Sequence, residues 1–348
     1  MMSEDFTSID KLGEFGLIQA LTEKIPLQKA STVLGIGDDA AAFEHLLELS
    51  LCSSDLLVEG VHFDLTYVPP QHLGYKAAVV NFSDIAAMNG RPSQLLINLG
   101  ISNRFGLEYL QELYRGIKLA CEVYEVDLVG GDTTSSFSGL LISGTAIGSV
   151  PSERLVKRSG AKPNDLVVVS GDLGGAYLGL QILQREKSVF EADPDMQPQL
   201  AGNEYVLQRQ LRPEARTDVV ELLESLDVIP TSMIDLSDGL SSDLLHLCEA
   251  SKTGVHLYEE KLPIDDQVFE LAETFSLNAS TVALNGGEDY ELLFTIDLKD
   301  HDKIKGHPHL SVIGHMTDLE EGRHLITPDG NRLALQAQGW NSLLKQQK

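Results

Sequence analysis

Aspartate stands beside glycine or serine after several apolar runs, and this recurring pattern constrains the fold more than any other feature of the chain. The fullest example is the DLSDG segment, residues 235–239, which follows an apolar run and precedes an amphipathic one. That order predicts a strand running into a helix, with Ser237 and Asp238 as N-cap residues. Related segments are Gly37-Asp38-Asp39, Ser54-Asp55, Ser83-Asp84 and Gly130-Gly131-Asp132.

The residue types of these turns indicate a site for magnesium and a nucleotide. Carboxylates that converge on one turn repel each other unless a cation lies between them. Magnesium takes oxygen ligands and is usually held by a few carboxylates together with substrate phosphates, while glycine lets the backbone approach a phosphate closely. A single aspartate is more simply explained as a cap or turn residue. The repetition of the pattern therefore favours the site.

Other motifs that bind phosphates or metals are missing from the sequence. It has no P-loop motif, no set of protein-kinase motifs and no HExxH segment. Histidines do not accompany the acidic turns, which disfavours softer metals. The glycine turn at residues 171–176 lacks the GxGxxG spacing, so a plain strand-to-helix turn is favoured there. The spacing within residues 235–239 does not fit an EF-hand, and a glycosidase would need only two carboxylates.

The charge balance of the chain disfavours some classes of partner. Its 348 residues include 52 Asp and Glu against 26 Lys and Arg, which gives a net charge of −26. This argues against a nucleic-acid partner, because binding to a phosphate backbone needs basic patches. The sequence shows no signal segment and no apolar run as long as a membrane span, and its three cysteines are widely spaced. We therefore expect a cytoplasmic protein with no membrane partner, no zinc and no structural disulfide.

Strand-like and helix-like segments alternate in both halves of the chain, which predicts an α/β (α+β) fold with two domains. Helices are expected at residues 72–88 and 107–123, and strands at 49–53, 126–129 and 140–150, so that Asp55 and Gly130 would stand just after their strands. A polar stretch at 186–202 predicts a surface loop. The domain boundary is expected near residues 151–163. Its basic residues 154–162 indicate an arm that reaches for phosphate, with a solvated linker as the alternative.

Taken together, seven segments resemble the thiamine-monophosphate kinase family, in order along nearly the whole chain. That family lies in the aminoimidazole ribonucleotide synthetase-like superfamily, which also includes selenophosphate synthetase and a hydrogenase-maturation protein. The segments that carry the resemblance are residues 35–41 (GIGDDAA), 54–63 (SDLLVEGVHF), 81–88 (NFSDIAAM), 130–134 (GGDTT), 158–163 (RSGAKP), 234–240 (IDLSDGL) and 286–292 (GGEDYEL).

The resemblance implies an activity and an architecture. The activity is ATP-dependent phosphorylation of thiamine phosphate to thiamine diphosphate, by direct in-line transfer with several Mg²⁺ ions and without a phospho-enzyme. The architecture is an N-terminal domain, residues 1–150, which binds ATP and Mg²⁺ and joins its sheet to that of a second subunit in a homodimer. A C-terminal domain, residues 151–348, has a mixed sheet with helices and completes the nucleotide and substrate site, so the two domains share the carboxylates of one divided metal site.

The resemblance also implies roles for individual residues. The family usually has threonine in the segment matched by Ser53-Ser54-Asp55, which affects only the detail of one metal contact. No side chain is expected to act as a catalytic base, because the attacking phosphate oxygen is already anionic and positioning falls to Mg²⁺ and Arg158. The matched positions are Asp39, Ser54, Asp55, Asp84, Asp132, Asp235 and Asp238 for metal, Gly131, Asp132, Arg158 and Ser237 for ATP, and His62, Glu288 and Trp340 for thiamine phosphate.

Several alternatives stay open at this point. Trp340 either packs on a cationic ring or anchors the C-terminal region by packing, and His62 is either a site residue or a core histidine. Another enzyme of the same superfamily with a different acceptor is the second hypothesis for function. A non-catalytic protein that binds a metal or a nucleotide is the third. Consumption of ATP that depends on thiamine phosphate and magnesium separates the three.

Overall fold

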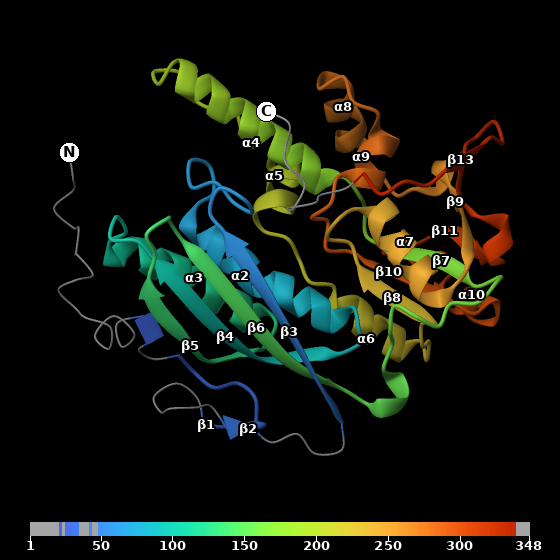
Figure 1. The fold of residues 1–348 in the computed structure, drawn as a ribbon, viewed down its shortest axis with the longest axis horizontal. Helices are drawn as coiled ribbons and strands as arrows, with labels where there is room; N and C mark the ends of the chain where they lie inside the picture. The colour runs from blue at the N-terminus through green and yellow to red at the C-terminus, as the bar shows by residue number, and fades with distance from the viewer. Residues whose placement is uncertain (1–20, 23–24, 35–41, 44–47, 339–348) are drawn as a thin grey trace. The chain divides into compact units, whose positions relative to one another are not determined.

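The computed structural model describes residues 21–22, 25–34, 42–43 and 48–338, and the chain divides into two compact units (Figure 1). Unit 1 consists of residues 1–85 and 90–152, and unit 2 of residues 86–89 and 153–348. Each unit has its own main sheet. A further pair of short strands, β1 (Thr32–Leu34) and β2 (Ala42–Phe43), belongs to unit 1.

Unit 1 is built on a four-stranded sheet with the strand order β3-β6-β4-β5. β4 and β5 are parallel, whereas β6 pairs antiparallel with both β3 and β4. The strands are β3 (Leu49–Val58), β4 (Arg91–Ile101), β5 (Asp127–Ser135) and β6 (Leu141–Val150), and the helices are α2 (Pro70–Ala86) and α3 (Leu107–Val123).

Two glycines allow α2 and α3 to pack backbone against backbone. A Cβ atom added to Gly74 would lie 1.9 Å from the carbonyl oxygen of Leu113, and one added to Gly116 would lie 1.8 Å from that of Gln71. Real Cβ atoms do not approach so closely, so both positions require glycine. The two helices bury a common apolar layer, and α2 is buried along most of its length. This burial fixes the polar residues of α2 firmly in the structure.

Unit 2 is built on a seven-stranded sheet with the order β13-β12-β9-β11-β7-β10-β8. All its neighbours are antiparallel except β9 and β12, which are parallel. The strands are β7 (Leu166–Ser170), β8 (Ser232–Asp235), β9 (Gly254–Tyr258), β10 (Leu292–Ile296), β11 (Leu310–Thr317), β12 (Arg323–Ile326) and β13 (Arg332–Ala334). The helices are α4 (Gly175–Ala192), α5 (Glu204–Leu211), α6 (Thr217–Ser225), α7 (Leu240–Ser251), α8 (Asp266–Thr274), α9 (Ala279–Asn285) and α10 (His301–Ile304).

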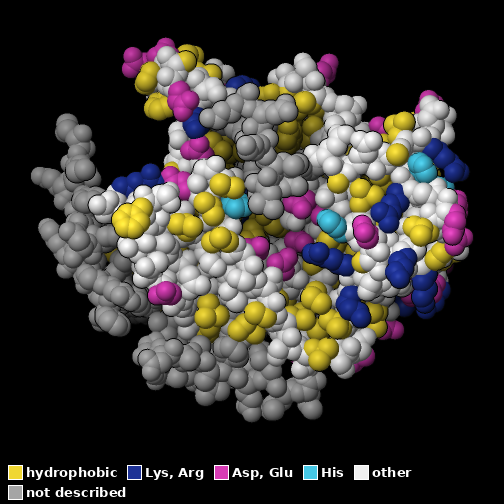
Figure 2. Space-filling view, viewed as in Figure 1, with side chains coloured by type: hydrophobic (Ala, Val, Ile, Leu, Met, Phe, Trp, Pro, Cys, Tyr) yellow, Lys and Arg dark blue, Asp and Glu magenta, His cyan; other side chains and the backbone are white. Residues whose placement is uncertain are grey.

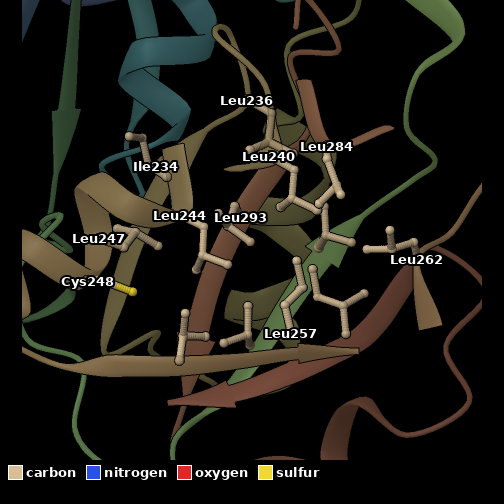
Figure 3. Packing of buried hydrophobic residues seen from close by; sticks show 14 of the residues in the cluster. Ile234, Leu236, Leu240, Leu244, Leu247, Cys248, Leu257, Leu262, Leu284 and Leu293 are labelled. Atoms are coloured by element: carbon tan, nitrogen blue, oxygen red, sulfur yellow. The ribbon is translucent and has the colours of Figure 1, made fainter. Parts of the chain in front are cut away.

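Both faces of this sheet are covered by apolar side chains. Alternate residues of β10 divide between two clusters, with Leu293 in one and Leu292 and Phe294 in the other. Figure 3 shows the first cluster, in which Leu244 of α7 packs towards Leu293. A strand that is buried on both faces has a nearly continuous apolar sequence, which explains the LLFTI sequence of β10.

The structure confirms the α/β architecture and the helix at residues 107–123, but it corrects three boundaries. Strand β3 continues through Asp55 to Val58, and β5 contains Gly130 and Asp132 rather than ending before them. The predicted loop at 186–202 begins as helix, because α4 runs to Ala192. In each case polar residues on an exposed face belong to the element, and an apolar run alone underestimates its length.

The excess of acidic residues does not cover the surface evenly. On the face shown in Figure 2, Lys and Arg side chains gather where β9, β11, β13 and α10 of unit 2 lie. Within the described residues, no helix is long and apolar enough to cross a membrane.

Candidate active-site residues in each unit

Two acidic residues of unit 1, Asp55 and Asp84, meet where α2 packs on β3. The hydroxyl of Ser53 donates a hydrogen bond to Asp84 Oδ2, and the backbone N–H of Asp55 donates to Asn81 Oδ1 at 3.0 Å. Asn81 in turn donates from Nδ2 to the carbonyl oxygen of Ala77 at 2.9 Å, which fixes its orientation. Burial, and then the charge of Asp84, raises the pKa of Asp55 from 3.8 to about 6. The structure therefore brings Asp55 and Asp84 close enough to repel each other.

Ser54 and Asp132, which are also predicted ligands of unit 1, lie on the opposite face of the sheet. Successive residues of a strand point to opposite faces, and Ser54 is exposed while Ser53 and Asp55 are partly buried. Ser54 donates to the carbonyl oxygen of Gly144 at 2.8 Å and lies 2.9 Å from the Thr145 hydroxyl. The structure therefore brings Ser53, and not Ser54, to Asp84.

Asp132 is separated from Asp55 by the width of the sheet. Asp55 pairs with Gly144, which pairs with Ile97, which pairs with Gly131. Three strand spacings amount to roughly 14 Å. Asp132 is exposed and lines a cavity of about 260 Å³. Unit 1 thus presents two separate polar regions, one on each face of its sheet.

Gly131 and His62 have structural explanations beside their predicted roles. A Cβ atom at Gly131 would lie 1.8 Å from the carbonyl oxygen of Ile97, so the strand pairing alone requires glycine there. His62 lies half-buried in the turn after β3, and its Nδ1 accepts a hydrogen bond from the N–H of Val58 at 3.0 Å. In the neutral ring the proton is then on Nε2, so this nitrogen is the donor that the ring can offer. His62 is not a core histidine.

In unit 2 the DLSDG segment joins β8 to α7 as the sequence predicts, but its cap is different. Gly239 is the N-cap residue, and it has a φ of +112°. Asp243, in the first turn of α7, accepts hydrogen bonds from the N–H groups of Asp238 at 3.2 Å and Gly239 at 3.1 Å. The prediction that Ser237 and Asp238 cap this helix is therefore wrong. A carboxylate from inside the helix reaches back and binds the amides of the turn.

Asp243 is a member of the acidic cluster to which the sequence assigned no role. It is buried, and burial followed by the charges of Asp235 and Asp238 raises its pKa from 3.8 to about 8. Burial also raises the pKa of Asp238, against the opposing charges of His246 and Arg158. Arg158 itself is exposed. The signal that could have identified Asp243 is its position four residues after Gly239. One helical turn separates the two residues, so the Asp243 side chain lies near the N–H groups at the start of α7.

The segment that contains Glu288 lies directly against the DLSDG turn. The N–H of Glu288 donates to the carbonyl oxygen of Ser237 at 2.8 Å, and that of Tyr290 donates to Leu236 at 2.9 Å. Glu288 Oε2 accepts a hydrogen bond from Gln210 Nε2 at 2.8 Å. The structure therefore brings together Ser237 and Glu288, which the sequence assigned to ATP and to thiamine phosphate respectively.

The donors of both units fit magnesium better than a softer metal. Asp84 lies beside Asp55, and Asp235 and Asp238 lie beside Asp243, and after burial these neighbouring carboxylates raise the pKa of Asp55 and of Asp243. Carboxylate oxygens suit magnesium rather than a softer metal. Among the described residues, no three His, Cys, Asp or Glu side chains are placed so that they could hold a metal ion together. Asp39 and Trp340 lie outside the described residues.

Comparisons with known proteins give the family. The family model "AIR synthase related protein, N-terminal domain" matches residues 37–150, and the corresponding C-terminal domain matches residues 162–324. The thiamine-monophosphate kinase of Bacillus subtilis (strain 168) is 33% identical over 337 residues, which cover 95% of this chain and 99% of the relative. That of Aquifex aeolicus (strain VF5) is 36% identical over 332 residues, which cover 95% and 98%.

A solved structure described as AaThiL complexed with AMPPCP and TMP has a TM-score of 0.72 and 32% identity, and the match covers 97% of this chain and 99% of that one. The family models, the relatives and this fold agree with the motifs over almost the whole length of the chain. The chain therefore belongs to the thiamine-monophosphate kinase family.

Proposed function

We propose that the protein transfers the γ-phosphoryl group of ATP to thiamine monophosphate, which gives thiamine diphosphate and ADP. The observation that carries the proposal is the identity of 33% and 36% with two thiamine-monophosphate kinases over 95% of this chain. The relation to a structure described as a complex with AMPPCP and TMP supports the same pair of substrates. The carboxylates clustered in each unit support a reaction in which several phosphate charges are handled.

Mg²⁺ is the cofactor of this proposal. Its ligands come from Asp39, Ser54, Asp55, Asp84, Asp132, Asp235 and Asp238. When bound, Mg²⁺ neutralises negative charge on the phosphates and on the carboxylates that hold it. The raised pKa of Asp55 supports the assignment, because a cation beside Asp55 and Asp84 would offset their repulsion.

The protein's own part in the reaction is binding and orientation. A phosphate oxygen of thiamine monophosphate is anionic at neutral pH, so the attack needs no side-chain base. Arg158 donates its guanidinium N–H groups to phosphate oxygens of ATP, which a planar fork can bind in pairs. Gly131, Asp132 and Ser237 complete the ATP contacts, and His62, Glu288 and Trp340 bind thiamine monophosphate. The negative charge of Glu288 suits the cationic thiazolium ring.

We further propose that the protein works in the cytoplasm as a homodimer. The exposed face of the unit 1 sheet is the dimer surface in this proposal. Leu56 of β3 is 54% exposed on that face, beside the cavity that Asp132 lines. Leu56 is on the edge strand of the sheet, and an apolar side chain exposed there is compatible with a surface that another sheet covers.

The test is an assay of the purified protein with ATP, thiamine monophosphate and MgCl₂. We expect thiamine diphosphate to form, with one ADP produced for each molecule, and no product when any one of the three is omitted. ATP consumption without thiamine monophosphate, or with another phosphate acceptor only, would favour a different enzyme of the superfamily. Nucleotide binding without turnover under any of these conditions would favour a non-catalytic protein.

A further inference from the structure

The segment that carries Glu288 has an unusual backbone that its surroundings must hold in place. Gly287, Glu288 and Tyr290 have φ values of +72°, +59° and +52°. Residues other than glycine rarely adopt this left-handed backbone conformation. Where they do, the surrounding structure must hold the strained backbone in place. Two backbone hydrogen bonds to the DLSDG turn hold one side of the segment.

Arg209 of α5 holds the other side. Its Nη2 donates to the carbonyl oxygen of Asp289 at 3.3 Å and to that of Asp172 at 2.9 Å. Its Nη1 donates to Glu291 Oε1 at 2.9 Å. The guanidinium therefore links the strained segment to the turn after β7 and to the residue before β10. The Arg209 side chain is 14% exposed, so solvent weakens these bonds little.

Two of the carboxylates around Arg209, those of Asp289 and Glu291, are themselves buried and accept hydrogen bonds. Asp289 is 2% exposed and accepts hydrogen bonds from the N–H of Gly174 at 3.1 and 3.0 Å. Glu291 Oε2 accepts from Ser170 Oγ at 2.5 Å and from Arg216 Nη1. Buried charges of one sign need buried partners of the other. Arg209 supplies that charge at the point where the segment bends.

The next residue of α5 contacts Glu288 directly. Gln210 is buried, and its Nε2 donates to Glu288 Oε2 at 2.8 Å. Consecutive residues of one helix thus fix the backbone and the side chain of the same segment. Sequence patterns did not single out either residue, because they lie 78 or more positions away from the contacts they make in this segment.

We propose that Arg209 and Gln210 are positioning residues for the binding of thiamine monophosphate, because they hold Glu288 in the orientation that this substrate requires. The proposal rests on the proposed function for the role of Glu288. It adds to that role a buried set of contacts from α5 that determines where the carboxylate points. Neither residue touches the reacting phosphates in this proposal.

Steady-state kinetics of the full-length enzyme separate positioning from general stability. We expect two variants, Arg209→Lys and Gln210→Ala, to raise the KM for thiamine monophosphate about tenfold. Arg209→Lys keeps the positive charge but loses the planar guanidinium group that donates several hydrogen bonds at once. The KM for ATP should stay within about twofold of wild type. Arg216→Lys is the matched control, because Arg216 also pairs with Glu291 but makes its other side-chain hydrogen bonds to Asp218. It should leave both KM values within about twofold.

A double-mutant cycle tests whether the two residues act through Glu288. In a Glu288→Gln background, Arg209→Lys and Gln210→Ala should cost clearly less in kcat/KM for thiamine monophosphate than they do in wild type. Additive losses, or equal increases in the KM for both substrates, overturn the proposal.

Hydrogen exchange in the protein without substrates gives an answer that does not depend on activity. The amides of Glu288 and Tyr290 should exchange faster in both variants, while amides of α7 exchange as in wild type. If wild-type protein makes no thiamine diphosphate, the proposed function fails. The exchange rates of the Glu288 and Tyr290 amides still show whether Arg209 and Gln210 hold the segment in place. Gln210→Ala protein with unchanged exchange at Glu288 overturns the proposal, whether or not Arg209→Lys folds.

Discussion

The acidic clusters of the two units are assembled in different ways. In unit 1, Asp55 and Asp84 meet because α2 packs on β3, so their proximity depends on a tertiary contact between separate elements. In unit 2, Asp235, Asp238 and Asp243 belong to one strand–turn–helix segment of nine residues. Both clusters have carboxyl groups with raised pKa values, and burial is the first cause in each.

The difference concerns what a substitution disturbs. A change in the unit 2 cluster alters a turn that the local sequence already defines, and the backbone bonds to Glu288 and Tyr290 support that turn from outside. A change in the unit 1 cluster alters the contact between a helix and a sheet. Because both clusters are proposed metal sites, substitutions in either should lower enzyme activity to a similar extent. The same substitutions should change the stability of the protein to different extents.

The largest expected effect comes from removing one charge in each cluster. We expect Asp84→Asn and Asp235→Asn to lower kcat for thiamine diphosphate formation by about 100- to 1000-fold, because charge neutralisation is the main task in phosphoryl transfer. Asp302→Asn, at a side chain that is 95% exposed, is the matched control. Circular dichroism checks that each variant folds. Near-normal turnover in either variant would show that its cluster is not a metal site.

A second comparison is between two adjacent serines of β3, Ser53 and Ser54. Ser53 donates to Asp84, whereas Ser54 bonds to Gly144 on the other face of the sheet. If Asp84 needs Ser53 for its orientation, Ser53→Ala should lower kcat by about tenfold, the usual value of a hydrogen bond to a charged group. Ser54→Ala should then have a smaller effect. The reverse order would support Ser54 as the metal ligand that the sequence predicts.

The pH dependence of stability tests both clusters together. A carboxyl with a higher pKa in the folded than in the unfolded protein binds more protons when folded, so its contribution is lost as the pH rises through the folded pKa. For Asp55 that range is 3.8 to about 6, and for Asp243 it is 3.8 to about 8. We expect the Tm of protein in EDTA to fall by a few degrees from about pH 5 to about pH 8.

Magnesium should reduce this fall, because a cation favours the charged carboxylates. Differential scanning calorimetry in EDTA and in MgCl₂ makes the measurement. A Tm in EDTA that rises steadily over the same pH range would contradict the buried, mutually repelling arrangement.

The smallest effect is expected for Asp243→Asn in unit 2. Asparagine keeps a carbonyl oxygen for the amides of Asp238 and Gly239 but never ionises. In EDTA this variant should match wild type near pH 4 and exceed its Tm by about one to three degrees above pH 8, because wild type loses the contribution of Asp243 between these two pH values. Lower stability than wild type at both pH values would mean that the negative charge of Asp243 helps to cap α7.

Much of the fold was accessible from the sequence because its signals are local. The spacing of apolar residues predicts α3 at its observed bounds, Leu107–Val123, and the DLSDG segment predicts the passage from β8 to α7. The motif order along the chain predicts the family that the comparisons confirm. The individual roles assigned to Asp132, Arg158 and His62 stay predictions.

The chain's own sequence determined its family, the order of its elements and the places of its acidic segments along the chain, because these depend on neighbours within a few residues. Only the tertiary structure decided that Ser53 rather than Ser54 meets Asp84, that Asp243 is buried, and that Arg209 holds the Glu288 segment. The physical reason is that strand register and helix packing set these contacts, and both are fixed by residues far apart in the chain.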